Sequence, residues 1–239
     1  MIRFDHVSKQ YAGHSALSDI TVEINDGEFV FLIGHSGAGK TTMLRLLIHE
    51  LVPTHGTLHV DSWNLTTLHS SQIYKLRRHV GTVFQDFKLL MDRTVFENVS
   101  LGLEILGKQP KEISSRVMDV LELVRLDHRK NYFPLQLSAG EMQRIAIARA
   151  IVGGPSILLA DEPTGNLDPQ TSWDILDILK EIHKIGTTIV MATHNESIVN
   201  DMKKRTITLD QGKIIHDEEK GKYRVATRVK GKQSHASTQ

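Results

Sequence analysis

The amino-acid sequence predicts an α/β fold, because apolar runs typical of buried strands alternate along the chain with segments of helical composition. The runs are Phe29–Ile33, Ile157–Ala160 and Thr187–Ala192. A helical segment follows the first run and extends to about His49. Another, with Asp168 as its N-cap and Pro169 as its first residue, extends to about Ile185 and separates the other two runs. We therefore expect one α/β core that contains these strands and helices.

Further strands are predicted on both sides of this core, because apolar and polar residues alternate there as in half-exposed strands. They lie at 2–7, 18–24 and 57–60, with turns at 25–27 and 53–56, a short strand at 80–84, and a closing hairpin at 205–209 and 213–216.

Helical signals interrupt the α/β pattern in the middle of the chain. Thr94 and Glu97 have the spacing of a capping box, and helical spacing continues to Leu106. Pro110 opens a second helical run whose apolar residues share one face. We expect an all-helical subdomain inserted at about 88–136, in which most apolar residues serve core packing.

Composition limits the classes of function. The chain has 239 residues, of which 40% are hydrophobic and 24% charged, and its net charge of +1 gives no global reason to expect nucleic acid. It has no cysteine, so disulfides and thiolate chemistry are excluded. No apolar run approaches the ~20 residues of a membrane-spanning helix, and the first residues lack the apolar core of a signal peptide. We expect a cytoplasmic chain that reaches a membrane only through a partner.

The C-terminal stretch differs from the rest. From Lys220 onward it is basic and has neither periodicity nor apolar content, and no acid follows Glu219. We expect a folded domain at 1–219 and a disordered tail at 220–239. The alternative is a weak contact with a membrane surface or a partner.

A glycine-rich segment follows the first apolar run and precedes the first helix. It consists of Gly34, His35, Ser36, Gly37, Ala38, Gly39, Lys40, Thr41 and Thr42. The spacing G-x-x-x-x-G-K-T between a strand and a helix is that of a P-loop, whose backbone N–H groups surround phosphate oxygens. Lys40 would reach the β- and γ-phosphates of a nucleotide, and the Thr41 hydroxyl would bind Mg²⁺. The alternative, a glycine-rich turn with a surface lysine, fits this context poorly.

An acidic pair, Asp161 and Glu162, follows the second apolar run. Adjacent strand residues point to opposite faces, so the two carboxylates need not share one role. Asp161 would hold Mg²⁺ through its water shell, and Glu162 would orient or deprotonate an attacking water. A solvated strand end is the alternative for the pair taken alone.

A second capping box lies in the segment that indicates which class of ATPase the chain resembles. Leu137 precedes Ser138, Ala139, Gly140 and Glu141, which open a helix extending to about Val152. This segment resembles the LSGGQ signature of the ATP-binding-cassette (ABC) ATPases, and the other motifs of that family occur in the same order. Tyr11 resembles the aromatic residue that stacks on adenine, Gln85 the Q-loop glutamine, Asn166-Leu167-Asp168 the D-loop, and His194 the switch histidine that contacts the γ-phosphate.

The resemblance covers roughly residues 1–216 and implies an ABC nucleotide-binding domain, with a P-loop ATPase core, an antiparallel β subdomain and a helical insert. It implies Mg²⁺-dependent ATP hydrolysis, with Lys40, Gln85, Glu162 and His194 in the reaction and Thr41, Gln85 and Asp161 near the metal. Two copies would meet head to tail, with ATP between the P-loop of one copy and Ser138 to Glu141 of the other. Ala139 and Glu141 depart from the family's Gly and Gln.

A narrower resemblance concerns partners. Several runs, among them Phe84–Leu90, Thr94–Val99 and Met191–Asn195, are similar to the cell-division members of the family of the Gram-positive type. This implies that the chain lies at the cytoplasmic face of the cell membrane, held there by an integral membrane partner. Through that partner it would act indirectly on extracellular peptidoglycan hydrolases. The alternative is the ATPase subunit of a lipoprotein-release or efflux transporter. The apolar cluster at Phe87–Phe96, including Leu89 and Leu90, predicts a dock for the membrane partner.

Overall fold

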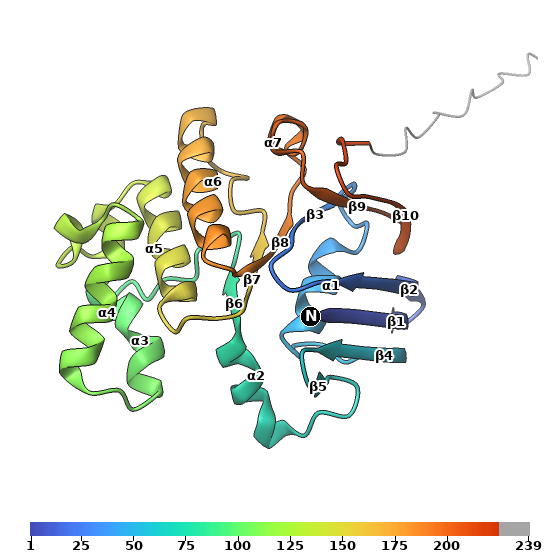
Figure 1. Ribbon diagram of the computed structural model, residues 1–239, viewed down its shortest axis with the longest axis horizontal. Helices are drawn as coiled ribbons and strands as arrows, with labels where there is room; N and C mark the ends of the chain where they lie inside the picture. The colour runs from blue at the N-terminus through green and yellow to red at the C-terminus, as the bar shows by residue number, and fades with distance from the viewer. Residues whose placement is uncertain (225–239) are drawn as a thin grey trace, which may run out of the picture.

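A six-stranded sheet forms the centre of the fold, with the strand order β10-β9-β3-β8-β7-β6 (Figure 1). The computed structural model describes residues 1–224, so most of the predicted basic tail lies outside the described residues. The strands are β3 (Phe29–Ile33), β6 (Val80–Val83), β7 (Ile157–Asp161), β8 (Thr188–Ala192), β9 (Arg205–Asp210) and β10 (Lys213–Glu218). Strands β9, β3, β8, β7 and β6 pair in parallel, and β10 is antiparallel to β9.

A second, antiparallel sheet has the order β2-β1-β4-β5. Its strands are β1 (Ile2–Tyr11), β2 (His14–Ile24), β4 (His55–Val60) and β5 (Trp63–Asn64). The three strands predicted here are all present, but β4 begins at His55, inside the predicted turn. The cause is long-range pairing, because His55 is opposite Ser8 of β1.

Seven α-helices occur within residues 1–224. They are α1 (Lys40–Leu47), α2 (Ile73–His79), α3 (Val95–Ile105), α4 (Pro110–Leu123), α5 (Ala139–Ile151), α6 (Pro169–Lys184) and α7 (Glu196–Met202), and 3₁₀ turns lie at Ser70–Gln72, Asp127–Arg129 and Pro134–Gln136. Helices α3 to α6 lie on one side of the six-stranded sheet, and α1 and the small sheet lie on the other (Figure 1). Among these residues, no helix is both long and apolar enough to cross a membrane.

Helices α2 and α7 were not predicted. Each has only seven residues. The signal for α7 was available, since Asn195 caps it by accepting a hydrogen bond from the N–H of Ile198.

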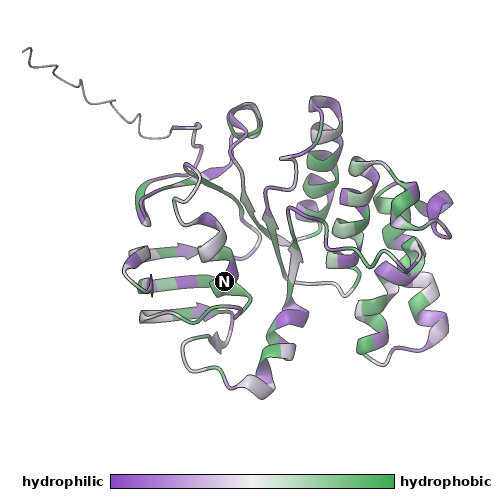
Figure 2. Cartoon of the chain, turned by 180° about the vertical axis from the view of Figure 1, so that it is seen from behind, coloured by the Kyte–Doolittle hydropathy of each residue, from purple (hydrophilic) through white to green (hydrophobic). Residues whose placement is uncertain are grey.

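Strand β3 separates two hydrophobic cores, because its side chains alternate between the faces of the sheet. Phe29, Phe31 and Ile33 pack in the core that includes α3 to α7. Val30 and Leu32 pack in the core that includes α1 and the antiparallel sheet. The hydrophobic colouring of the central strands follows this burial (Figure 2). Because the α3–α4 insert shares its core with α5 and α6, it is a layer of the domain rather than an independent unit.

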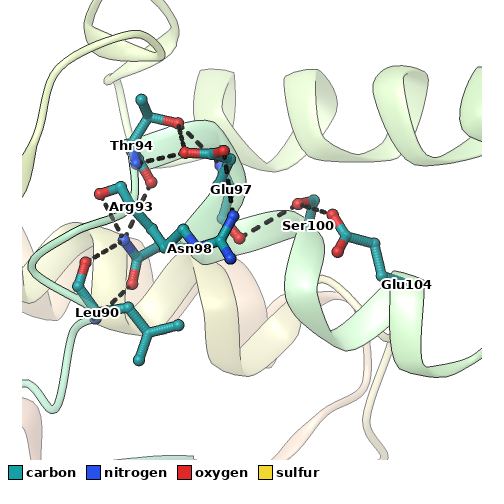
Figure 3. Close-up of polar contacts among 7 residues, drawn as sticks. All are labelled: Leu90, Arg93, Thr94, Glu97, Asn98, Ser100 and Glu104. Carbon is teal, nitrogen blue, oxygen red and sulfur yellow. Dashed lines mark hydrogen bonds and ion pairs between the residues drawn. The ribbon is translucent and has the colours of Figure 1, made fainter.

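The loop before α3 is held by Asn98, which is fully buried (Figure 3). Its Oδ1 accepts a hydrogen bond from the N–H of Leu90 at 2.9 Å. Its Nδ2 lies 3.0 Å from the carbonyl oxygen of Leu90, 3.1 Å from that of Arg93 and 3.0 Å from that of Thr94. One amide thus satisfies four backbone groups of the loop and fixes the segment that carries Leu90.

The predicted apolar dock is wrong for Leu89 and remains a prediction for Leu90. Leu89 is 9% exposed and belongs to the helical core, so core packing accounts for it. Leu90 and Met91 are 40% and 50% exposed and remain on the surface. The pattern of apolar residues could not separate these neighbours, because the loop conformation set by Asn98 decides which side chain points inward.

Replacing Asn98 with alanine should destabilise the fold by about 1–3 kcal/mol, since buried backbone groups lose their partner. Urea unfolding followed by circular dichroism measures this. Ser100→Ala on the same helix is the control, because it removes one hydroxyl and leaves the 90–94 loop bonded. Equal unfolding free energies for the two variants would contradict the role given to Asn98.

Candidate active site

A cavity of about 710 Å³ lies at the carboxyl ends of β3, β7 and β8. It is lined by Tyr11, His14, Ala16, the whole segment 34–42, Gln85, Glu162, His194 and Tyr223. The predicted residues of the P-loop, together with Gln85, Glu162 and His194, therefore contribute to one cavity, whereas Asp161 does not line it. His14, Ala16 and Tyr223 were not predicted, because no local motif marks them.

The P-loop requires glycine where its backbone approaches other strands. Gly34 has φ 149°, and a Cβ there would lie 2.3 Å from the carbonyl oxygen of Leu209. Gly39 has φ 110°, and its Cβ would lie 2.7 Å from Leu17. A side chain at either position would clash with these neighbours, and glycine also adopts positive φ values more readily than other residues. Both reasons favour glycine at these two positions.

Lys40 opens α1 and is 8% exposed. Its ammonium group donates to the carbonyl oxygens of Gly34 at 2.8 Å and His35 at 3.2 Å, so it is held inside the loop. No side chain caps the N-terminus of α1. Its first N–H groups, together with a buried positive charge, form an environment suited to phosphate.

The residues predicted near the metal line one smaller hollow of about 290 Å³, to which Thr41, Gln85 and Asp161 contribute. Burial raises the pKa of Asp161, and the adjacent Thr41 hydroxyl opposes this shift. A bound cation would favour the charged carboxylate. Within residues 1–224, no group of three His, Cys, Asp or Glu side chains could hold a metal. The few oxygen donors present match Mg²⁺, which keeps most of its waters.

Glu162 and His194 form a pair at the end of the cavity. Glu162 Oε2 lies 2.8 Å from His194 Nδ1 and accepts a second hydrogen bond from the His194 backbone N–H at 3.3 Å. Glu162 has φ 50°, a left-handed conformation that turns the chain directly after Asp161. The Glu162 side chain is 12% exposed, whereas that of His194 is 64% exposed. The carboxylate is therefore sheltered, and the imidazole faces the open side.

Tyr11 lies at the rim of the cavity, with its ring 45% exposed. The Lys9 ammonium lies 5.4 Å from the centre of this ring. An exposed aromatic face at the rim is suited to stacking against a flat base.

The predicted signature residues do not line this cavity. Ser138 caps α5 by accepting a hydrogen bond from the Glu141 N–H, while Glu141 accepts one from the Ser138 N–H at 2.8 Å. Ser138 and Ala139 are exposed, and Gly140 is buried. A Cβ at Gly140 would lie 2.4 Å from Thr171, so glycine is needed there for α5 to pack against α6.

The two departures from the family motif are accommodated locally. Ala139 is the first helical residue of α5, where its methyl group is exposed. The Glu141 carboxylate is held by Ser138 and lies 3.4 Å from Arg129. Burial would raise the pKa of Glu141, but the hydrogen bonds from Ser138 and the charge of Arg129 outweigh it and lower that pKa. Its negative charge is therefore partly neutralised within the chain.

A family model described as ABC transporter matches residues 17–165, which contain the P-loop, the signature and the acidic pair. The chain belongs to this family. It is an ATPase of the ABC type, and the sequence-based assignment of family and fold is confirmed.

The chain is similar to cell-division members of the family, as predicted. It is 51% identical to the cell division ATP-binding protein FtsE of Bacillus subtilis (strain 168), over 93% of this chain and 98% of that protein. The identity to FtsE of Mycobacterium tuberculosis (strain ATCC 25618 / H37Rv) is 50%, over 93% and 98%. The identity to FtsE of Escherichia coli (strain K12) is 45%, over 90% and 97%.

Solved ABC cassettes share the fold. A dimeric post-hydrolysis structure of the ATP-binding cassette MJ0796, bound to ADP and Pi, superimposes with a TM-score of 0.85. It is 34% identical over 93% of this chain and 100% of that one. A second dimeric structure of MJ0796 gives a TM-score of 0.85 at 35% identity.

Ser138→Asp tests whether Ser138 is more than a helix cap. Aspartate is as good an N-cap as serine, so the melting temperature should stay near that of the parent. If Ser138 contacts the triphosphate bound by another copy, the added carboxylate should repel it and abolish hydrolysis while ATP still binds. Fluorescence titration with an ATP analogue and an ATPase assay separate these effects. Parent-like hydrolysis would show that Ser138 only caps α5.

Proposed function

We propose that two copies of the chain bind two ATP molecules head to tail and hydrolyse them. The observation that carries this is the separation of the motifs: the P-loop cavity lacks the signature residues, while Ser138 and Ala139 are exposed elsewhere, at the N-terminus of α5. A second copy could supply them. The dimeric MJ0796 structures support the same arrangement.

The residues of the cavity have separate roles in this proposal. The segment 34–42 binds the phosphates, with Lys40 at the β- and γ-phosphates, and Tyr11 stacks on adenine. Thr41, Gln85 and Asp161 hold Mg²⁺, which would neutralise phosphate charge when bound. Ser138, Ala139, Gly140 and Glu141 of the other copy close on the γ-phosphate.

Glu162 is the proposed general base for hydrolysis. It accepts a proton from the water whose oxygen attacks the γ-phosphorus, and the bond to the ADP oxygen breaks, which leaves ADP and phosphate. His194 lies within hydrogen-bond reach of Glu162 and is exposed toward the cavity. It is therefore placed to orient the base and to contact the γ-phosphate.

The proposed output is movement of an FtsX-like membrane partner, which regulates peptidoglycan hydrolases outside the cell during division. The support is the similarity to FtsE proteins. The chain would then act at the cytoplasmic face of the membrane, held there through that partner.

A groove of about 590 Å³ between α2, α3 and α5 is the proposed partner dock. Exposed Tyr74 and Ile105 are among the residues that line it. Arg149 also lines it and donates to the carbonyl oxygens of Phe87 at 2.8 Å and Lys88 at 2.6 Å, just after Gln85. The groove contains no residue of the dock predicted at Phe87–Phe96, and Arg149 connects the two surfaces. A partner seated in the groove would contact Arg149, which is bonded to the segment directly after Gln85.

Glu162→Gln tests the ATPase proposal. The variant retains the shape of the side chain and removes the base, so turnover should fall by about 10²–10⁴-fold while ATP binding persists. With ATP and Mg²⁺ it should accumulate as a dimer on size exclusion, because the step that reopens the dimer is blocked. Normal turnover would refute the role of Glu162. A monomeric variant would refute the head-to-tail sandwich.

Ile105→Asp tests the dock. Ile105 is 70% exposed, so the charge should leave the fold and ATP binding unchanged while it disrupts an apolar contact. Co-purification from membranes with an FtsX-like protein should be lost. Ile185→Asp is the matched control, because Ile185 is 78% exposed and lies outside the groove. Recovery of a lipoprotein-release or efflux permease with the parent chain would favour the transporter alternative.

A further inference from the structure

The segment after β10 returns to the ATPase site through three contacts. The Gly221 N–H donates to the Lys204 carbonyl oxygen at 3.2 Å. The Tyr223 N–H donates to Asn200 Oδ1 on α7 at 2.9 Å. A Cβ at Gly221 would lie 2.4 Å from Thr206, so the backbone lies directly against β9. Gly221 and Tyr223, in the part of the predicted tail that the structure describes, are thus packed against the domain, while Lys220, Lys222 and Arg224 are exposed.

The contacts bring Tyr223 to the nucleotide cavity. Its ring is half-buried and packs against the hydrophobic core that includes Ile198 and Val199 of α7. The same side chain lines the cavity together with Glu162 and His194. Burial raises the pKa of Tyr223, and the negative charges of Glu162 and Glu196 raise it further, so its hydroxyl stays protonated.

We propose that Tyr223 is a positioning residue of the ATPase site, whose ring forms the wall beside Glu162 and holds the Glu162–His194 pair in one arrangement. The inference rests on the proposed role of Glu162 as general base. Tyr223 acts through that carboxylate and does not bind the nucleotide. The ring packs against the core that includes α7 residues and lines the cavity, and it has this effect rather than the hydroxyl.

Steady-state ATPase kinetics of Tyr223→Ala test the proposal. Misplacement of a catalytic group lowers the rate of the chemical step, so kcat should fall roughly tenfold. The KM for ATP should stay within about twofold of the parent value, because the variant keeps the contacts that bind ATP equally in the ground state and the transition state. Tyr223→Phe retains the ring and should restore kcat to within about twofold of the parent. An unchanged kcat in the alanine variant, a change confined to KM, or failure of phenylalanine to rescue would each overturn the proposal.

Arg224→Ala is the control within the same segment. Arg224 is exposed, pairs with Glu218 at 3.3 Å and does not line the cavity, so its loss should leave kcat unchanged. A kcat loss equal to that of Tyr223→Ala would show that the segment as a whole matters and not the ring. If Tyr223→Ala does not fold, Asn200→Ala provides the same test, since it releases the Tyr223 backbone and should lower kcat with KM unchanged.

A double-mutant cycle with Glu162→Gln shows which residue Tyr223 acts through. If it acts through Glu162, Tyr223→Ala should cause no further loss of the residual turnover of Glu162→Gln. An equal fold-loss in both backgrounds would mean that Tyr223 acts independently and would overturn the inference. Failure of the proposed function can be distinguished from failure of this inference. It would appear as normal turnover in the Glu162→Gln single variant.

Discussion

The active site depends on the parallel pairing of β3 with β8 and of β8 with β7. Parallel strands end at the same edge of a sheet, so the segments that follow them lie side by side. Backbone hydrogen bonds extend this pairing beyond the strands. The Glu162 N–H donates to the Ala192 carbonyl oxygen at 3.0 Å, and the Thr193 N–H donates to that of Leu32 at 3.1 Å. Glu162, His194 and the glycine-rich loop therefore start from fixed backbone positions.

The P-loop is supported from a second direction by the turn between β9 and β10. The Gly212 N–H donates to the Ala38 carbonyl oxygen at 3.0 Å, and its own carbonyl accepts a hydrogen bond from the Ser18 N–H at 2.8 Å. One turn thus connects the phosphate loop to the antiparallel sheet. Since Tyr11 at the end of β1 belongs to that sheet, Tyr11 and the glycine-rich loop are held in fixed positions on the same cavity.

Helix α5 connects the signature residues with the segment that follows Gln85. Ser138 begins the helix, and near its end Arg149 bonds the carbonyl oxygens of Phe87 and Lys88, both of which have left-handed backbone conformations. One continuous helix therefore lies between the segment after Gln85 and the signature residues. This geometry supports a mechanical connection between the groove, the Q-loop and the signature end.

The sequence by itself determined the family, the P-loop, the acidic pair and the helix caps at Thr94, Ser138 and Asp168. Each of these depends on residues within a few positions of one another, and such local spacing is visible without a fold. The side-chain caps are confirmed at all three positions. The short helices were missed because their few residues give little periodicity.

Only the tertiary structure decided which of Leu89 and Leu90 is buried, why Gly140 must lack a side chain, and that Tyr223 borders the cavity. These outcomes come from Asn98, Thr171 and Asn200, each in contact with a residue that no local motif connects to it. The path of the folded backbone brings such residues together. The hydrophobic pattern along the chain carries no information about which residues will meet when they are far apart in the sequence. Long-range packing and backbone hydrogen bonding therefore fixed the parts of the site that spacing could not.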